Sequence, residues 1–251
     1  MKAIFYIFLL AAAALLATGA HAQASRLDDG IVRAAKQSYV FKHYLKAEDI
    51  KIESKEGAVT LTGLVAADYY RALAQGIVTD LPGVKSVDNR LEVIGAAPTA
   101  NSDAWLRDKV KATLQFHWSV SVATTEVDVK DGIVTLRGSA ASQAQKDLTG
   151  EYAMDVEGIK GVTNNIAVDG APKKKVQTTR EKIDDVSVSA LVRMALLLHH
   201  STNALYTTVA TKRGVVTVGG KAKTEAEKGL VTRIAKDVSG VKSVKNEMSV
   251  E

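Results

Sequence analysis

The chain is organised around a short glycine-flanked, β-like run that occurs three times. Each copy has a glycine, five residues rich in Val and Thr, and a second glycine, and a third glycine follows twenty residues later. Similarity at a fixed spacing is the signature of repeat architecture, so it constrains the fold more than composition does. The copies are residues 57–63 with Gly83, 132–138 with Gly158, and 214–220 with Gly240.

Longer segments of 63 residues align around these runs without a gap. They are residues 31–93, 106–168 and 188–250. The stretches between them contain glycine, proline and small or basic residues, which is typical of domain boundaries. We therefore predict domains at residues 28–93, 103–168 and 185–250, joined by a linker at 94–102 and a basic linker at 169–184.

Each segment has the pattern of an α-β-β-α-β unit. In the second segment Leu106, Val110 and Leu114 share one helix face. A polar connection ending in Gly132 joins two β-rich runs, as in a hairpin. We predict an α+β fold of three tandem αββαβ domains, each a small mixed three-stranded sheet with two helices on one face. The last strand should run parallel to the strand before the second helix, and the central strand is left open.

Glycines and polar residues punctuate these units. The second glycine of each copy (Gly63, Gly138 and Gly220) is expected to end a strand, and the third (Gly83, Gly158 and Gly240) to end a helix. Capping boxes are predicted at 142–145 and 224–227. Helix N-caps are predicted at Asp28, at Ser102 or Asp103, and at Asp184 or Asp185.

The first 22 residues have the features of a secretory signal peptide. Lys2 precedes an apolar run over residues 4–16, and Ala20-His21-Ala22 has the small-x-small pattern of a cleavage site. Thirteen residues of helix rise only about 20 Å, which is short for a transmembrane anchor. We expect cleavage after Ala22 and, in a Gram-negative bacterium, a periplasmic product without a transmembrane segment.

Cysteine content and charge narrow the function further. The chain has no cysteine, so it has no disulfide and no thiol for a lipoprotein anchor. Residues 171–251 carry 15 Lys or Arg against 8 Asp or Glu, whereas residues 101–170 carry 7 against 10. The basic character therefore belongs to the last third, and an anionic partner is expected there.

The complete repeat pattern resembles the BON domain. The shared signature is an apolar helix stripe, a V-x-V run, G-x-V-x-L-x-G, and then G-V-x-x-V-x-N-x-L, as at residues 83–91. The resemblance covers nearly all of the chain after residue 27 and implies an αββαβ fold, a periplasmic location, association with anionic phospholipid, a role in envelope integrity under osmotic stress, and no enzymatic activity. Familiar members have two such domains, and this chain has three.

Catalytic and metal-binding motifs are absent from the sequence. His43, His117, His199 and His200 follow no metal-ligand spacing, and we interpret them as surface or helix-end residues. No phosphate-binding glycine loop occurs, so no cofactor or metal is predicted. Asn89, Asn164 and Asn246 recur in the last strands and are interpreted as satisfying local backbone groups. The signal peptide and the few aromatic residues argue against nucleic acid.

The first helix of the third repeat is apolar on every side except at Arg193. Such a helix is either buried against a neighbouring repeat or faces lipid or a partner. On the second interpretation Leu191, Met194 and Leu198 form a binding surface. Basic residues and an interfacial indole would join it: Lys173, Lys174, Lys175, Lys212, Arg213 and Trp118.

Two functions follow from these patterns. The first is a non-enzymatic periplasmic protein that associates peripherally with anionic phospholipid and supports envelope integrity under osmotic stress. The alternative is a periplasmic chaperone or protein-interaction module for envelope proteins that uses the apolar helix.

Overall fold

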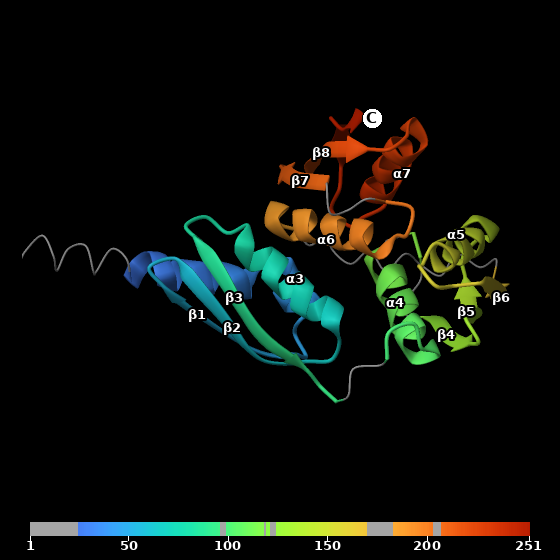
Figure 1. The fold of residues 1–251 in the computed structure, drawn as a ribbon, viewed down its shortest axis with the longest axis horizontal. Coiled ribbons are helices and arrows are strands. Elements are labelled where there is room, and N and C mark those ends of the chain that lie inside the picture. Colours follow the sequence, from blue (N-terminus) through green and yellow to red (C-terminus); the bar gives the residue numbers. More distant parts are fainter. Residues whose placement is uncertain (1–24, 96–98, 118, 121–123, 170–182, 203–206) are drawn as a thin grey trace, which may run out of the picture. The chain divides into compact units, whose positions relative to one another are not determined.

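A computed structural model describes residues 25–95, 99–117, 119–120, 124–169, 183–202 and 207–251 (Figure 1). The described residues form helix-strand-strand-helix-strand three times in succession. The predicted α+β class of three tandem αββαβ domains is confirmed. We call residues 28–93, 103–168 and 185–250 the first, second and third repeats. The chain divides after Ile94 into two compact units, the first repeat and the pair formed by the second and third.

The elements have corresponding bounds in each repeat. The first has a helix over residues 25–37, α2 (Tyr39–His43), β1 (Asp49–Lys55), β2 (Ala58–Val65), α3 (Asp68–Thr79) and β3 (Ser86–Val93). The second has α4 (Asp103–Phe116), β4 (Thr125–Lys130), β5 (Ile133–Ala140), α5 (Gln143–Met154) and β6 (Gly161–Val168). The third has α6 (Asp185–Leu198), β7 (Thr207–Lys212), β8 (Val215–Ala222), α7 (Glu225–Lys236), β9 (Ser243–Asn246) and β10 (Ser249–Val250).

The second strand of each repeat is the centre of its sheet. β2 pairs antiparallel with β1 and parallel with β3, and β5 pairs in the same way with β4 and β6. In the third repeat β8 pairs antiparallel with β7, and the last strand is split into β9 and β10, which both run parallel to β8. The predicted parallel crossover is therefore confirmed, and the structure supplies the central strand.

Both helices of a repeat cover one face of its sheet. In the second repeat Leu106, Val110 and Leu114 of α4 pack with Val134 and Leu136 of β5 in one apolar core. Figure 1 shows α3, the second helix of the first repeat, lying across the sheet of that repeat. The alternation along β5 leaves Ile133 48% exposed on the other side. Because successive side chains of a strand point to opposite faces, each sheet has one face buried under the helices and one face exposed to solvent.

The first helix of the first repeat differs from its counterparts. It is interrupted at Ser38, whose hydroxyl donates to the carbonyl of Ala35 and caps α2. Val40 is buried there, while Tyr39, which aligns with the stripe residue Leu114 of the second repeat, is half-exposed. The substitution of tyrosine for the leucine of the other repeats thus coincides with a break in the helix.

An aspartate near the start of the first helix fastens it to the hairpin turn. In the second repeat the Asp103 carboxylate accepts the backbone N–H groups of Asp131 at 2.8 Å and Gly132 at 3.0 Å, and these bonds lower the pKa of Asp103. Asp28 and Asp185 accept the equivalent pairs. The N-caps themselves are Ser102 and Asp184. The N-cap prediction is wrong for Asp28, which follows three helical residues and serves as this fastener.

The central strands continue past their second glycine, contrary to expectation. β5 runs two residues beyond Gly138, which adopts a φ of +126°. A Cβ at this position would lie 1.7 Å from the carbonyl oxygen of Thr124, the residue just before β4. The glycine therefore allows the edge strand to approach closely rather than ending the central one. The matching glycines, Gly63 and Gly220, have φ values of +122° and +117°.

The second helices end before their glycine, also contrary to expectation. α5 and α7 are C-capped by Asp155 and Asp237, and α3 by Asp80. The predicted glycines lie three residues later with φ values near +90°, and they are Gly83, Gly158 and Gly240. The predicted capping boxes at 142–145 and 224–227 are confirmed, because Ser142 and Thr224 accept from the backbone of Gln145 and Glu227. Two of the C-cap aspartates form the site described below.

The recurring asparagines join the last strand to the second helix. The Asn164 amide donates to the carbonyl of Lys146 at 2.7 Å, and its oxygen accepts from the backbone of Ile166. Asn89 and Asn246 make the same pair of contacts. These bonds agree with the interpretation that the asparagines satisfy backbone groups.

Candidate functional site

The apolar helix of the third repeat is buried along most of its surface. Leu191, Met194 and Leu198 of α6 are 0%, 4% and 7% exposed. The helix packs against β7 and α7 of its own repeat and against α4 of the second repeat. The three leucine and methionine side chains therefore lie in the interior and offer no surface to lipid or a partner. Burial against a neighbouring repeat, the other interpretation of this helix, describes them instead.

α4 supplies a matching second stripe. Ala112, Thr113 and Phe116 are at most 1% exposed, yet they are not members of the core that Leu106, Val110 and Leu114 build. Residues three and four apart lie on one side of a helix, so these three form a stripe distinct from the core stripe. Because α4 packs on α6, we infer that this stripe lies in the contact between the second and third repeats.

Thr113 contains a buried hydroxyl that has no hydrogen-bond partner among the described residues. Thr113→Val should raise the free energy of unfolding by about 1 kcal/mol, since an unmade hydrogen bond costs about 1–3 kcal/mol. Urea denaturation followed by circular dichroism measures the change. Thr149→Val is the matched control: Thr149 is equally buried, but its hydroxyl donates to the carbonyl of Gln145 at 2.7 Å. The control should lose stability, and changes of the same sign in both variants would contradict this account.

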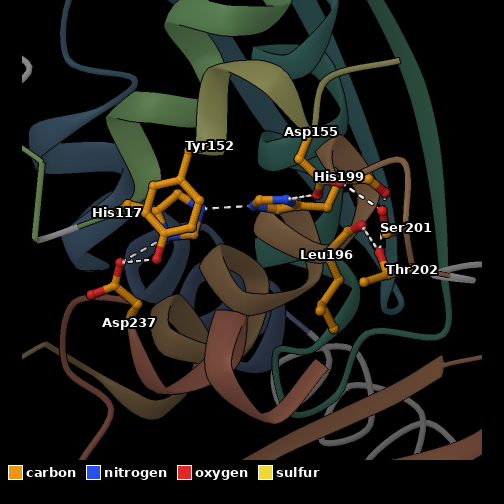
Figure 2. A network of polar contacts seen from close by, with 8 residues as sticks. All are labelled: His117, Tyr152, Asp155, Leu196, His199, Ser201, Thr202 and Asp237. Atoms are coloured by element: carbon orange, nitrogen blue, oxygen red, sulfur yellow. Dashed lines mark hydrogen bonds and ion pairs between the residues drawn. The ribbon is translucent and has the colours of Figure 1, made fainter. Parts of the chain in front are cut away.

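Two histidines meet where α4 and α6 end. His117 and His199 are the C-cap residues of these helices and are only 2% and 4% exposed. Their Nε2 atoms lie 2.9 Å apart, as Figure 2 shows. The ring of Tyr152 stacks on His117 with centroids 3.8 Å apart. The histidines were predicted as surface or helix-end residues, and for these two only the helix-end part is right.

An aspartate from the opposite repeat holds each histidine (Figure 2). Asp237 of the third repeat accepts from His117 Nδ1 at 3.2 Å, and Asp155 of the second repeat contacts His199 Nδ1. Serine hydroxyls donate to the same carboxylates, Ser119 to Asp237 and Ser201 to Asp155. The stacked Tyr152 donates its hydroxyl to Asp237 at 2.6 Å.

The arrangement is a two-fold one made by two different repeats. His117 and His199 occupy the same position in the aligned segments, as do Asp155 and Asp237 and the two serines. Each repeat gives its histidine to the other repeat's aspartate, which is the contact rule of an isologous interface. The symmetry breaks at Tyr152, because the third repeat has Ile234 at that position.

The hydrogen bonds specify how many protons the pair holds. Each Nδ1 faces a carboxylate and so must carry a hydrogen, while the Nε2 contact needs one donor and one acceptor. Three protons on two rings make one neutral imidazole and one imidazolium. Burial lowers the pKa of His117, against the opposing effect of the hydrogen bond to Asp237. Although burial acts to raise it, the bonds from His117, Ser119 and Tyr152 lower the pKa of Asp237.

The first repeat lacks the histidine of this histidine–aspartate pairing. The residue aligned with the two histidines is Lys42, which is exposed, although Asp80 matches the aspartates. The histidine network therefore distinguishes the second and third repeats from the first, and its enclosed position suits it to joining two repeats.

A second feature sets the third repeat apart, namely the tip of its hairpin. Lys212 and Arg213 are exposed there, and the Lys242 ammonium donates to the carbonyl of Arg213 at 3.0 Å. Asp185 accepts the backbone N–H groups of the turn. The tip thus gathers three cations around one carboxylate. We call Lys212, Arg213 and Lys242 the basic tip.

The equivalent tips of the other repeats are balanced. The second repeat has Asp131 at the position of Arg213, and the first has Glu56, each with a left-handed φ of 54–55°. With two lysines and the helix aspartate, each of these tips has two cations and two carboxylates. A single substitution at one turn position therefore makes the third repeat different in charge.

The remaining predicted binding residues divide into two groups. Arg193 is half-buried on α6. Lys173, Lys174, Lys175 and Trp118 lie outside the described residues. Trp105, the other indole, packs partly buried on the core of the second repeat beneath the Lys109 ammonium. Of the predicted set, the structure brings Lys212 and Arg213 together on a surface.

Within the described ranges no group of three or more His, Cys, Asp or Glu side chains could hold a metal ion. Over the same residues, no helix combines the length and the hydropathy required to cross a bilayer.

Known proteins share the repeat. The family model described as BON domain matches residues 28–95, 102–170 and 184–251. Osmotically-inducible protein Y of Escherichia coli is 29% identical over 202 residues, which cover 80% of this chain and 98% of that protein. Outer membrane lipoprotein DolP of Haemophilus influenzae is 28% identical over 156 residues, covering 61% of this chain and 80% of that protein.

Solved structures give a weaker match. CdsD, a structural protein of the type III secretion system of Chlamydia trachomatis, covers 88% of this chain and 92% of its own at 15% identity, with a TM-score of 0.24. A score this low carries no argument about fold or function.

Proposed function

Because the chain belongs to the BON domain family, whose model matches it three times, we propose that it is a non-enzymatic protein of the bacterial envelope. It attaches peripherally to anionic phospholipid through the basic tip and supports envelope integrity under osmotic stress. The names of its relatives, an osmotically inducible protein and an outer membrane lipoprotein, support this setting. The apolar run and small-x-small pattern before residue 23 support export to the periplasm.

The observation that carries the proposal is the charge of the tip. Lys212, Arg213 and Lys242 are exposed at one end of the sheet, and Asp185 already accepts two backbone hydrogen bonds. Near an anionic membrane each Lys or Arg contributes about 1 kcal/mol within a Debye length. Three cations together give a weak, reversible attachment that the basic linker, at residues 169–184, can strengthen.

Flotation of the purified chain with liposomes tests this proposal. We expect the chain to float with vesicles that contain phosphatidylglycerol and to remain behind with phosphatidylcholine alone. High salt should release it, because salt screens charges that are exposed to solvent. Equal behaviour with both lipids, or binding that salt leaves unchanged, would contradict the charge-driven attachment.

The alternative function, a chaperone or interaction module for envelope proteins, needs an apolar surface. Leu191, Met194 and Leu198 were predicted to provide one, and they are buried on a helix that packs against the second repeat. This function therefore requires the second and third repeats to separate first. Suppression of client aggregation without lipid, lost in Met194→Glu, would favour it over lipid attachment.

A further inference from the structure

The hydrogen bond that joins the second and third repeats requires the His117–His199 pair to hold three protons. One Nε2–H donates to the other Nε2 across 2.9 Å. A fourth proton would place two N–H groups and two positive charges at this distance. The pair therefore cannot take up that proton and keep its hydrogen bond.

The groups that face the pair come from four elements and the loops after them. Asp155 and Asp237, the C-cap residues of α5 and α7, contact the Nδ1 atoms, and Tyr152 of α5 stacks on His117. His200, next to His199, acts on the Asp155 charge, and Glu151 acts on the Tyr152 hydroxyl. The two carboxylates stabilise the first positive charge of the pair, and among the described residues no carboxylate contacts either Nε2 to stabilise a second.

We propose that the His117–His199 pair is a pH-sensitive latch: uptake of a fourth proton breaks the Nε2 contact, separates the second and third repeats, and exposes the apolar stripes of α4 and α6. The stripes include Phe116 and Leu191, which are buried in the closed pair. The latch does not depend on lipid binding, because the basic tip lies on a different element.

The sign of the pH dependence follows from the direction of the His117 shift. Burial lowers the pKa of His117 in the closed state below its ordinary 6.5. Below about pH 6.5 the open state binds more than the three protons of the closed pair, so the closed state loses stability as the pH falls toward the lowered value. Above about pH 6.5 two separated rings hold only two protons, so the closed state is most stable near pH 6.5. In that window the open-to-closed ratio rises by up to about tenfold per pH unit for one proton.

The aspartates respond at lower pH. Hydrogen bonds from His199 and Ser201 hold the pKa of Asp155 below its ordinary 3.8 despite the opposing effect of burial, and Asp237 is lowered in the same direction. Both carboxylates therefore remain charged while the fourth proton binds. Opening above pH 4 is thus assigned to the histidines, and opening below it to the carboxylates.

Fluorescence energy transfer in the full chain measures the opening. The chain has no cysteine, so Ala144→Cys and Ala226→Cys on α5 and α7, two exposed and equivalent positions, can carry the dyes. Between about pH 6.5 and pH 5 we expect the transfer efficiency to change reversibly, with a midpoint below about 6.5. A hydrophobic dye should bind over the same range. A constant transfer efficiency down to pH 5 would overturn the proposal.

Neutral variants assign the transition to the pair. His199→Gln and His117→Gln should remove the transition above pH 4, while His200→Gln, at an exposed neighbour, should keep it. Persistence of the transition in both pair variants would overturn the latch. If both variants are already open at pH 6.5, nitrogen NMR of the wild-type rings decides. Protonation of His117 at the opening midpoint supports the latch, and protonation at a separate pH overturns it.

Discussion

Gly138→Ala should unfold the second repeat. A Cβ at this position meets the carbonyl oxygen of Thr124 at 1.7 Å and its carbon at 2.9 Å. Both atoms belong to the backbone leading into β4, so no side-chain rotation relieves the clash. The φ of +126° is also strained for an L residue. We expect a loss of about 4 kcal/mol or more, a large share of the stability of so small a unit.

Thermal unfolding followed by circular dichroism checks this prediction. The matched control is Gly161→Ala, a glycine in β6 of the same sheet with no atom within 4 Å of an added Cβ. The control should melt close to the wild type. Similar melting of the two variants would contradict a requirement for glycine at position 138.

Asp237→Ala should weaken the contact between the second and third repeats by about 3 kcal/mol or more, because each buried donor left without its acceptor costs about 1–3 kcal/mol. The variant leaves three donors without their acceptor, and they are His117 Nδ1, Ser119 Oγ and Tyr152 Oη. Asp155→Ala removes the partner of only His199 and Ser201 and should cost less. Urea denaturation and hydrogen exchange of α4 and α6 report the loss.

Asp88→Ala is the control for Asp237→Ala. Asp88 is 53% exposed and forms an ion pair with Arg90 on the surface of the first repeat. An exposed pair of this kind contributes at most about 1 kcal/mol. Equal losses in Asp88→Ala and Asp237→Ala would contradict the account of the buried network.

The sequence predicted the architecture because the repeat pattern is local. Alternation in the strands and a spacing of four in the helices, as at Leu106, Val110 and Leu114, identify each element and its buried side. The errors occur where a contact distant in sequence decides. Gly138 lies inside β5 because of the approach of Thr124, and Asp28 fastens a hairpin 28 and 29 residues later. Neither partner could be found from neighbouring residues.

The site was harder to predict than the fold. The α6 pattern left burial and exposure open, because the deciding partner is the second stripe of α4 at Ala112, Thr113 and Phe116. The sequence analysis tested the histidines only for the spacing of metal ligands. The feature that identifies them is instead their matching position in the aligned repeats. His117 and His199 align with each other, Asp155 and Asp237 also align, and the first repeat has Lys42 in place of the histidine. Differences between aligned repeats were therefore the informative feature.

The basic tip is also identified by a difference between aligned repeats. Arg213 replaces the acidic Asp131 and Glu56 of the other turns while keeping their left-handed backbone. The natural repeats thus supply substitutions that change the charge of the tip without changing its shape, since aspartate tolerates this conformation well.

Liposome flotation of Arg213→Asp tests the attachment most directly. The variant gives the third repeat the balanced tip of the second, and we expect its affinity for anionic vesicles to fall roughly thirtyfold, from two charges of about 1 kcal/mol each. Adding Asp131→Arg should restore binding by moving the basic tip to the second repeat. Lys46→Asp makes the same change in net charge at an exposed site of the first repeat and should have little effect. Wild-type binding by Arg213→Asp, or an equal loss in Lys46→Asp, would contradict attachment through the basic tip.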